Sequence, residues 1–185
     1  MLTAENKTRY TAEDYMLLEE GAPFQLINYD LIMSPSPKAT HQLISMKLTS
    51  LILDFLKKTN NKGLFLSAPM DVKLDDGNIF QPDLIYATAE RKEEILKDRI
   101  EGAPDLVVEI LSPSNGYYDL RQKKDIYEKH GVAEYIIIDP LQQSVEVHVL
   151  KDGLYSLDQK VKLQASFYST VLKGFAIDLK ELFEQ

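Results

Sequence analysis

An apolar stretch near the middle of the chain predicts a buried central β-strand: Asp105-Leu106-Val107-Val108-Glu109-Ile110-Leu111. Apolar side chains alternate onto both faces of such a strand, which is typical of a strand covered on both sides. Glu109 breaks this pattern. A carboxylate among apolar neighbours costs several kcal/mol unless a charge or a hydrogen-bond donor meets it. The stretch therefore predicts a layered α/β protein with a buried acid that needs a partner.

Two further charged residues lie among apolar neighbours. Asp83 lies in the segment 79–86, which we expect to be another strand. Lys123 lies in a predicted helix over 118–130, at the centre of the apolar side to which Tyr127 also belongs. Two acids and a lysine can compensate one another around a divalent cation, and this arrangement is typical of metal-assisted phosphodiester cleavage.

Each of these charged residues has a structural interpretation when it is taken alone. Lys123 would extend past Tyr127 to water, and Glu109 would pair with any nearby cation. The combination of acid, acid and lysine around one central strand favours a functional site instead.

The rest of the chain alternates helices with strands. We expect further helices from Thr11, over 40–58, from Thr88 to about 98, and near Phe183. We expect further strands over 24–33, 64–66, 70–74, 134–139, 145–150 and 154–157. The turn residues Asp75-Asp76-Gly77-Asn78 predict a hairpin. Helices between strands, with hairpins at the edges, predict a mixed β-sheet between helical layers, in one domain over 1–185.

Composition and charge narrow the possible classes of function. The chain has 185 residues, no Cys and a net charge of −8, so disulfides and thiolate metal sites are excluded. The acidic balance weakens a nucleic-acid interpretation but does not exclude it, because charge acts within a Debye length of about 8 Å. No window approaches the roughly 18 apolar residues of a membrane span. We expect a cytoplasmic protein with no membrane partner.

The order of the motifs resembles the PD-(D/E)XK nuclease superfamily and, more closely, the Uma-two family of restriction-type endonucleases. The resemblance covers about 24–183, and four segments carry it: Gln81-Pro82-Asp83-Leu84, residues 106–114, Lys123 with Tyr127 followed by 131–135, and 172–179. It implies a restriction-endonuclease-like mixed β-sheet flanked by helices.

The resemblance also implies a chemistry, namely an endonuclease that hydrolyses the phosphodiester bonds of DNA with a metal-activated water. Mg²⁺ would be the cofactor, with Mn²⁺ as a substitute. Asp83 and Glu109 would be metal ligands, with the Ile110 carbonyl as a third oxygen. Lys123 would position the water or stabilise charge on the phosphate. Since paired nuclease domains commonly cut two strands, we expect a homodimer.

The chain departs from the pattern of these families at two positions. Leu111 stands two residues after Glu109, where the superfamily usually has its lysine, and Lys123 on the helix would replace that lysine. Gln25 stands where the family commonly has an acid in its first strand, so it can hydrogen-bond a metal-bound water but adds no charge.

Three further residues complete the sequence-based expectations. His41, near the start of the long helix, either borders the site or lies on the surface at the helix end. Tyr127 is a core residue or supports the site, and His148 is expected on the exposed side of a strand.

Without metal, Asp83 and Glu109 should repel each other, so that one of them titrates at a raised pH.

A second function class stays open. The chain would then be a non-catalytic module with a nuclease fold that binds nucleic acid or protein. Gln25 and the acidic balance favour this alternative, whereas Asp83, Glu109 and Lys123 favour the nuclease. Cleavage assays in Mg²⁺ or Mn²⁺ separate the two.

Overall fold

The strands of the protein form two larger sheets and a two-stranded ribbon. The computed structural model describes residues 9–34, 36–112 and 117–184. Its helices are α1 (Ala12–Met16), α2 (Ala39–Lys58), α3 (Lys92–Ile95), α4 (Tyr117–His130) and α5 (Leu179–Phe183). Its strands are β1 (Phe24–Ile27), β2 (Asp30–Met33), β3 (Leu64–Ser67), β4 (Val72–Asp75), β5 (Asn78–Phe80), β6 (Leu84–Ala87), β7 (Ile100–Glu101), β8 (Leu106–Ile110), β9 (Glu134–Asp139), β10 (Ser144–Lys151), β11 (Leu154–Lys162), β12 (Ser166–Tyr168) and β13 (Ala176–Asp178).

The predicted central strand is β8. It lies inside a six-stranded sheet of order β11-β10-β9-β8-β6-β3, and all five of its residues are buried. It runs parallel to β9 and antiparallel to β6, so the sheet is mixed, as expected. Residues 113 and 114, the end of the motif that begins at Leu106, lie outside the described residues.

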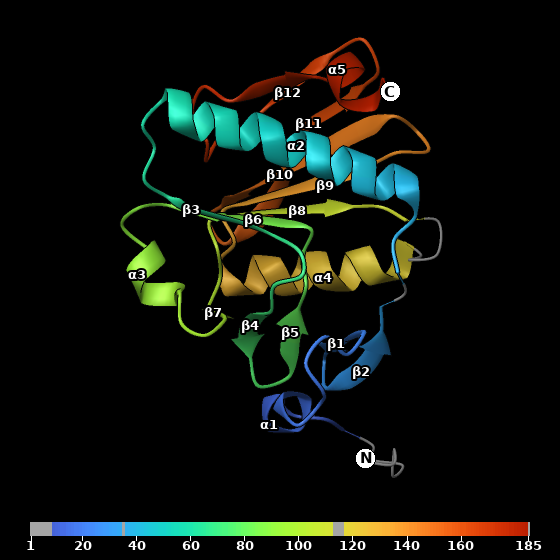
Figure 1. The fold of residues 1–185 in the computed structure, drawn as a ribbon, viewed down its shortest axis with the longest axis vertical. Helices are drawn as coiled ribbons and strands as arrows, with labels where there is room; N and C mark the ends of the chain where they lie inside the picture. Colours follow the sequence, from blue (N-terminus) through green and yellow to red (C-terminus); the bar gives the residue numbers. More distant parts are fainter. Residues whose placement is uncertain (1–8, 35, 113–116, 185) are drawn as a thin grey trace.

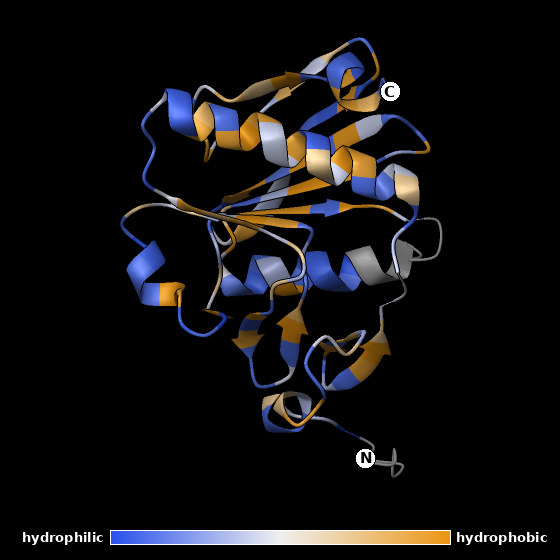
Figure 2. Cartoon of the chain, viewed as in Figure 1, coloured by the Kyte–Doolittle hydropathy of each residue, from blue (hydrophilic) through white to orange (hydrophobic). Residues whose placement is uncertain are grey.

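Helices cover both faces of this sheet (Figure 1). The stripe of α2 that contains Leu48 and Ile52 packs in one hydrophobic cluster with Val108 of β8. On the other face, Tyr127 of α4 packs in a second cluster with Val107. Figure 2 shows mainly apolar colouring along the strands between the two helices. The predicted layering is confirmed, and its cause is the two-sided apolar pattern of β8.

A five-stranded sheet, of order β2-β1-β5-β4-β7, packs against α4 and adds a layer that the sequence did not predict. The expected single strand over 24–33 is wrong, because the chain reverses between β1 and β2. Asn28 and Tyr29 have φ of 51° and 68° in this turn. The backbone N–H of Asn28 donates to Asn78 Oδ1 at 3.0 Å, which ties the turn to β5.

The expected continuous strand over 79–86 is also wrong, and the difference positions the site. β5 ends at Phe80 in the five-stranded sheet, and β6 begins at Leu84 in the six-stranded sheet. Pro82 has no N–H to donate to a strand ladder, which favours a break there. Asp83 therefore lies in the connection between the two sheets.

The other predicted elements are mostly confirmed, and one helix is shorter than expected. The helix expected from Thr88 to about 98 is reduced to the four residues of α3, because the chain after Thr88 first makes a turn and Leu96 then forms a bridge with Ile100. Among the described residues, no helix is long and apolar enough to cross a membrane.

Candidate active site

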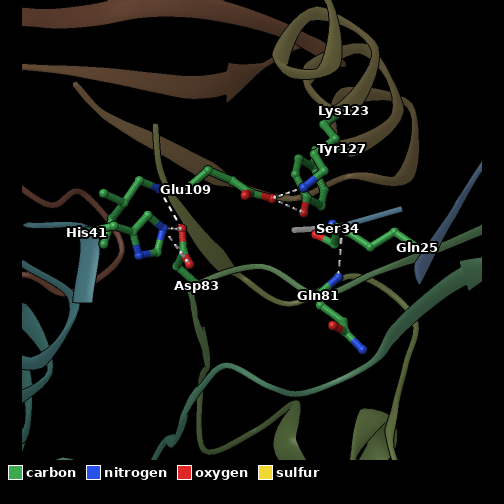
Figure 3. Close-up of polar contacts among 9 residues, drawn as sticks. Gln25, Ser34, His41, Gln81, Asp83, Glu109, Lys123 and Tyr127 are labelled. Carbon is green, nitrogen blue, oxygen red and sulfur yellow. Dashed lines mark hydrogen bonds and ion pairs between the residues drawn. The ribbon is translucent and has the colours of Figure 1, made fainter. Parts of the chain in front are cut away.

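Glu109 is buried at the end of β8 and meets two donors from α4 (Figure 3). Lys123 Nζ and Tyr127 Oη each donate a hydrogen bond of 3.0 Å to Glu109 Oε1. The two donors are four residues apart, so they lie on the same face of the helix. Lys123 is only 4% exposed, so the structural interpretation in which it extends into water is wrong.

Asp83 accepts a hydrogen bond from the residue that follows Glu109. The backbone N–H of Ile110 donates to Asp83 Oδ2 at 2.7 Å. His41 Nε2 lies 3.1 Å from Oδ1 and 3.2 Å from Oδ2 of the same carboxylate. His41 is therefore buried at the site and does not lie on the surface at the helix end. The three residues that the sequence singled out, Asp83, Glu109 and Lys123, are brought together.

The electrostatics of Glu109 agree with two acids that share one site. Burial raises the pKa of Glu109, the charge of Asp83 raises it further, and Lys123 and Tyr127 lower it, so that the net pKa is raised. The pKa of Tyr127 is raised well above its usual value by burial and by the charge of Glu109, so its hydroxyl stays protonated and donates. The direction of the Glu109 pKa agrees with the expectation that one acid titrates high, but burial, rather than repulsion by Asp83, is the largest cause.

His41 responds to the same charges. Burial lowers its pKa, but the hydrogen bond and the charge of Asp83, with the charge of Glu109 and the backbone of Ile110, raise it by more. The pKa of His41 is therefore raised. A protonated imidazole compensates one negative charge in the cluster, as the Lys123 ammonium does for Glu109.

Among the described residues, Gln25 hydrogen-bonds to neither acid but holds the segment that leads to Asp83. Its Oε1 accepts the backbone N–H of Gln81 at 3.1 Å, and its Nε2 donates to Ser34 Oγ at 2.9 Å (Figure 3). Gln25 is 5% exposed. The roles of Gln81 and Ser34 were not predicted, because these residues lie 56 and 9 positions from Gln25 in the chain and no local pattern marks the contacts.

The donors at the site are hard oxygen atoms. Asp83 and Glu109 offer carboxylates, and Ile110, the residue after Glu109, offers a backbone carbonyl near His41. In the part of the chain that the structure describes, no group of three His, Cys, Asp or Glu side chains is arranged to hold a metal ion. Two carboxylates with a carbonyl fit Mg²⁺, which keeps several waters, but not a metal that needs a closed cage of side chains.

The fold and the cluster define an α/β protein of the restriction-endonuclease-like class. A family model described as "Uma2: Putative restriction endonuclease" matches residues 12–180. The chain belongs to this family, and the resemblance inferred from its motifs is confirmed.

A solved structure shares the fold. It is described as a "putative nuclease belonging to DUF820" from Anabaena variabilis ATCC 29413, with a TM-score of 0.77 and 20% sequence identity. The match covers 94% of this chain and 97% of that one. No curated protein matches the chain. The roles predicted for Asp83, Glu109, Ile110 and Lys123 stay predictions.

Proposed function

We propose that this protein is an endonuclease that hydrolyses phosphodiester bonds of DNA with Mg²⁺, for which Mn²⁺ can substitute. The observation that carries the proposal is the buried Lys123–Glu109 ion pair, whose atoms are 3.0 Å apart, beside the carboxylate of Asp83. Membership of a restriction-endonuclease family supports the nuclease class.

A divalent cation would supply the positive charge that the cluster needs to bind an anionic phosphodiester. Two acids and one lysine leave a net charge of −1, and a protonated His41 brings it to zero. A phosphodiester is an anion, so a neutral or negative cluster does not attract it. Asp83, Glu109 and the Ile110 carbonyl would hold Mg²⁺, which supplies a Lewis acid and lowers the pKa of a bound water.

The remaining residues hold these groups in place. Tyr127 donates to the same Glu109 oxygen as Lys123 and restricts how that carboxylate can rotate. The Lys123 ammonium, buried and fixed by Glu109, would stabilise negative charge that develops on the phosphate, because a fixed charge of this kind needs no reorganisation in the transition state. Gln25 holds the backbone two residues before Asp83.

A cleavage assay tests the proposal. The purified chain is incubated with plasmid DNA, single-stranded DNA and RNA in Mg²⁺, Mn²⁺ or EDTA, and we expect DNA cleavage only with the metals. Asp83→Asn and Lys123→Met should lose cleavage. Asp54→Asn and Lys129→Met, at exposed positions of α2 and α4, should retain it. Wild-type cleavage by a folded Asp83→Asn variant would refute the proposed chemistry.

The same assay tests the alternative of a non-catalytic module. DNA binding without cleavage in any cation would support the non-catalytic module, which the neutral Gln25 and the contact of His41 with Asp83 favour.

We propose that double-strand cleavage uses a homodimer. Sedimentation of the chain with and without DNA should then show a species of twice the monomer mass.

A further inference from the structure

A small cavity lies on the β9 side of β8 in the six-stranded sheet. Asp83, which precedes β6, lies on the other side of β8. The cavity has a volume of about 230 Å³ and lies between α4 and strands β9, β10 and β11. Arg121 and Lys124 of α4 line it, as do Glu146, His148 and Lys160 of the sheet. None of these residues takes part in the cluster around Glu109, so the cavity is a separate site.

Both acids of this cavity already have partners, which are side chains for Glu146 and neutral backbone N–H groups for Asp139. Lys160 Nζ lies 2.7 Å from Glu146 Oε1, and His148 Nε2 lies 3.4 Å from Glu146 Oε2. Asp139 Oδ1 accepts the backbone N–H groups of Leu141 and Gln142 at 2.9 and 3.0 Å.

Two cations remain at the cavity. Neither Arg121 nor Lys124 forms an ion pair with any residue that the structure describes. The lining then carries three cations, with Lys160, against the carboxylates of Glu146 and Asp139. This excess of one positive charge, in a chain with a net charge of −8, favours a local positive potential.

His148 lines the same cavity. The expectation that it is exposed is wrong, because its side chain is buried. β10 is an interior strand, and the His148 ring stacks on Tyr135 at 6.3 Å between centroids, which leaves the side chain 6% exposed. Burial and then the charge of Lys124 lower the pKa of His148, while Glu146 opposes them. Its Nδ1 has no hydrogen-bond partner within the described ranges. A nearby anion would stabilise the protonated form of this imidazole and could accept a hydrogen bond from its Nδ1.

We propose that the cavity binds one phosphate group, held by Arg121 and Lys124 next to His148. Arginine presents a planar fork that suits phosphate oxygens, and lysine adds a point charge. The volume lies below the range of about 300–1,000 Å³ for pockets that enclose whole small molecules, so the cavity fits a single charged group.

The phosphate belongs to the nucleic-acid strand that the enzyme cuts, a source that rests on the proposed function. Leu111 lines the cavity and directly follows Ile110, whose N–H holds Asp83. On α4, Lys123 contacts Glu109 whereas its neighbour Lys124 lines the cavity. A strand that crosses the end of β8 therefore reaches the catalytic cluster with one phosphate and the cavity with another.

The three histidines of the chain allow a direct test, because each reports on a different region. His41 contacts Asp83, His148 lines the cavity, and His130 pairs with Asp75 at 2.9 Å as an internal control. Imidazole NMR resonances of the wild-type chain are recorded with inorganic phosphate, and separately with a phosphorothioate oligonucleotide in Mg²⁺. We expect phosphate to shift His148 and raise its pKa without moving His130.

Matched variants assign the site. The double variant Arg121→Gln with Lys124→Gln should bind phosphate roughly tenfold or more weakly, because two charge-assisted contacts are lost. Lys162→Gln, at an exposed position of β11, should bind as the wild type does. Unchanged phosphate binding in the double variant would overturn the assignment.

The outcomes separate this inference from the proposed function. Oligonucleotide that shifts both His41 and His148 supports a backbone phosphate as the source. Inorganic phosphate that shifts His148, with no response to the oligonucleotide at any histidine, supports a site for free phosphate and counts against the proposed function. An unmoved His148 with both ligands overturns the inference, even if His41 responds to the oligonucleotide and the nuclease proposal stands.

Discussion

Two buried glutamates on neighbouring parallel strands have different partners, and the difference separates a structural acid from a candidate catalytic one. Glu109 is the fourth residue of β8, and Glu134 is the first residue of β9, so the two lie toward opposite ends of the strand pair. Burial is the largest cause of a raised pKa in both. Neither burial nor the direction of the pKa shift tells them apart.

Within the described part of the chain, the hydrogen-bond donors to Glu134 are all neutral. Its Oε2 accepts from Ser169 Oγ at 2.9 Å, from Thr170 N and Oγ1 at 2.8 Å each, and from Val171 N at 2.7 Å. These bonds fasten the segment before β13 to the start of β9. Glu109 instead meets the Lys123 ammonium and the charge of a second carboxylate. A charged partner and a nearby acid, rather than burial, are what distinguish a site that can hold a cation.

The largest expected effect that separates the two glutamates is on cleavage. Glu109→Gln removes a charge that would bind metal, so we expect a loss of about 100-fold or more, as for other lost electrostatic groups in active sites. Glu134→Gln keeps an acceptor oxygen and should retain the specific activity of the folded protein. Rates on plasmid DNA in Mg²⁺ measure both. Equal losses in the two variants would contradict the distinction.

The next effect is on stability and concerns Glu134. Glu134→Ala removes the acceptor of four hydrogen bonds and leaves buried donors without a partner, so we expect a loss of about 3 kcal/mol in the free energy of unfolding. Glu134→Gln should lose less than half of that, because its carbonyl oxygen still accepts. Urea denaturation measures both variants, and a Glu134→Ala variant as stable as wild type would show that these bonds contribute nothing.

Metal should stabilise the protein through the site that contains Glu109 and not through Glu134. Mg²⁺ or Mn²⁺ at ten times its Kd should add about 1.4 kcal/mol, which raises the Tm by a few degrees. The Glu134→Gln variant should show the same rise, and Glu109→Gln should show none. A wild-type melting curve that millimolar Mg²⁺ and Mn²⁺ leave unchanged would argue against the metal site.

The smallest effect is a pH dependence from Glu134. The folded state raises its pKa above 4.5, so the folded state binds the proton more tightly than the unfolded state. The resulting stability is fully present below about pH 4.5 and is lost as the pH rises through the raised pKa, by at most about 1.4 kcal/mol per pH unit. Denaturation from pH 4.5 upward should show this slope in wild type and a shallower one in Glu134→Gln. Because Glu109 also contributes to the slope and would bind the metal, the test is the difference in slope between wild type and Glu134→Gln, which should be the same with and without Mg²⁺.

Much of the site was predictable because its signals are local. The apolar context of Glu109 indicated a buried acid, and the spacing of Lys123 and Tyr127 placed both on one helical face. The contact of His41 with Asp83 joins residues 42 positions apart, and the sequence left its place open between the site and the surface. The burial of His148 was missed because an alternating pattern does not tell an interior strand from an edge strand.

The amino-acid pattern alone was enough to predict the two-sided burial of β8, its flanking helices and the acid that required a partner, because these follow from periodicity and from the cost of desolvating a charge. The reversal at Asn28, the division of 79–86 between two sheets and the pairing of each acid arose only when distant segments packed together. Each of these features is stabilised by contacts between residues far apart in the chain, so no window of sequence contains the interaction that selects it.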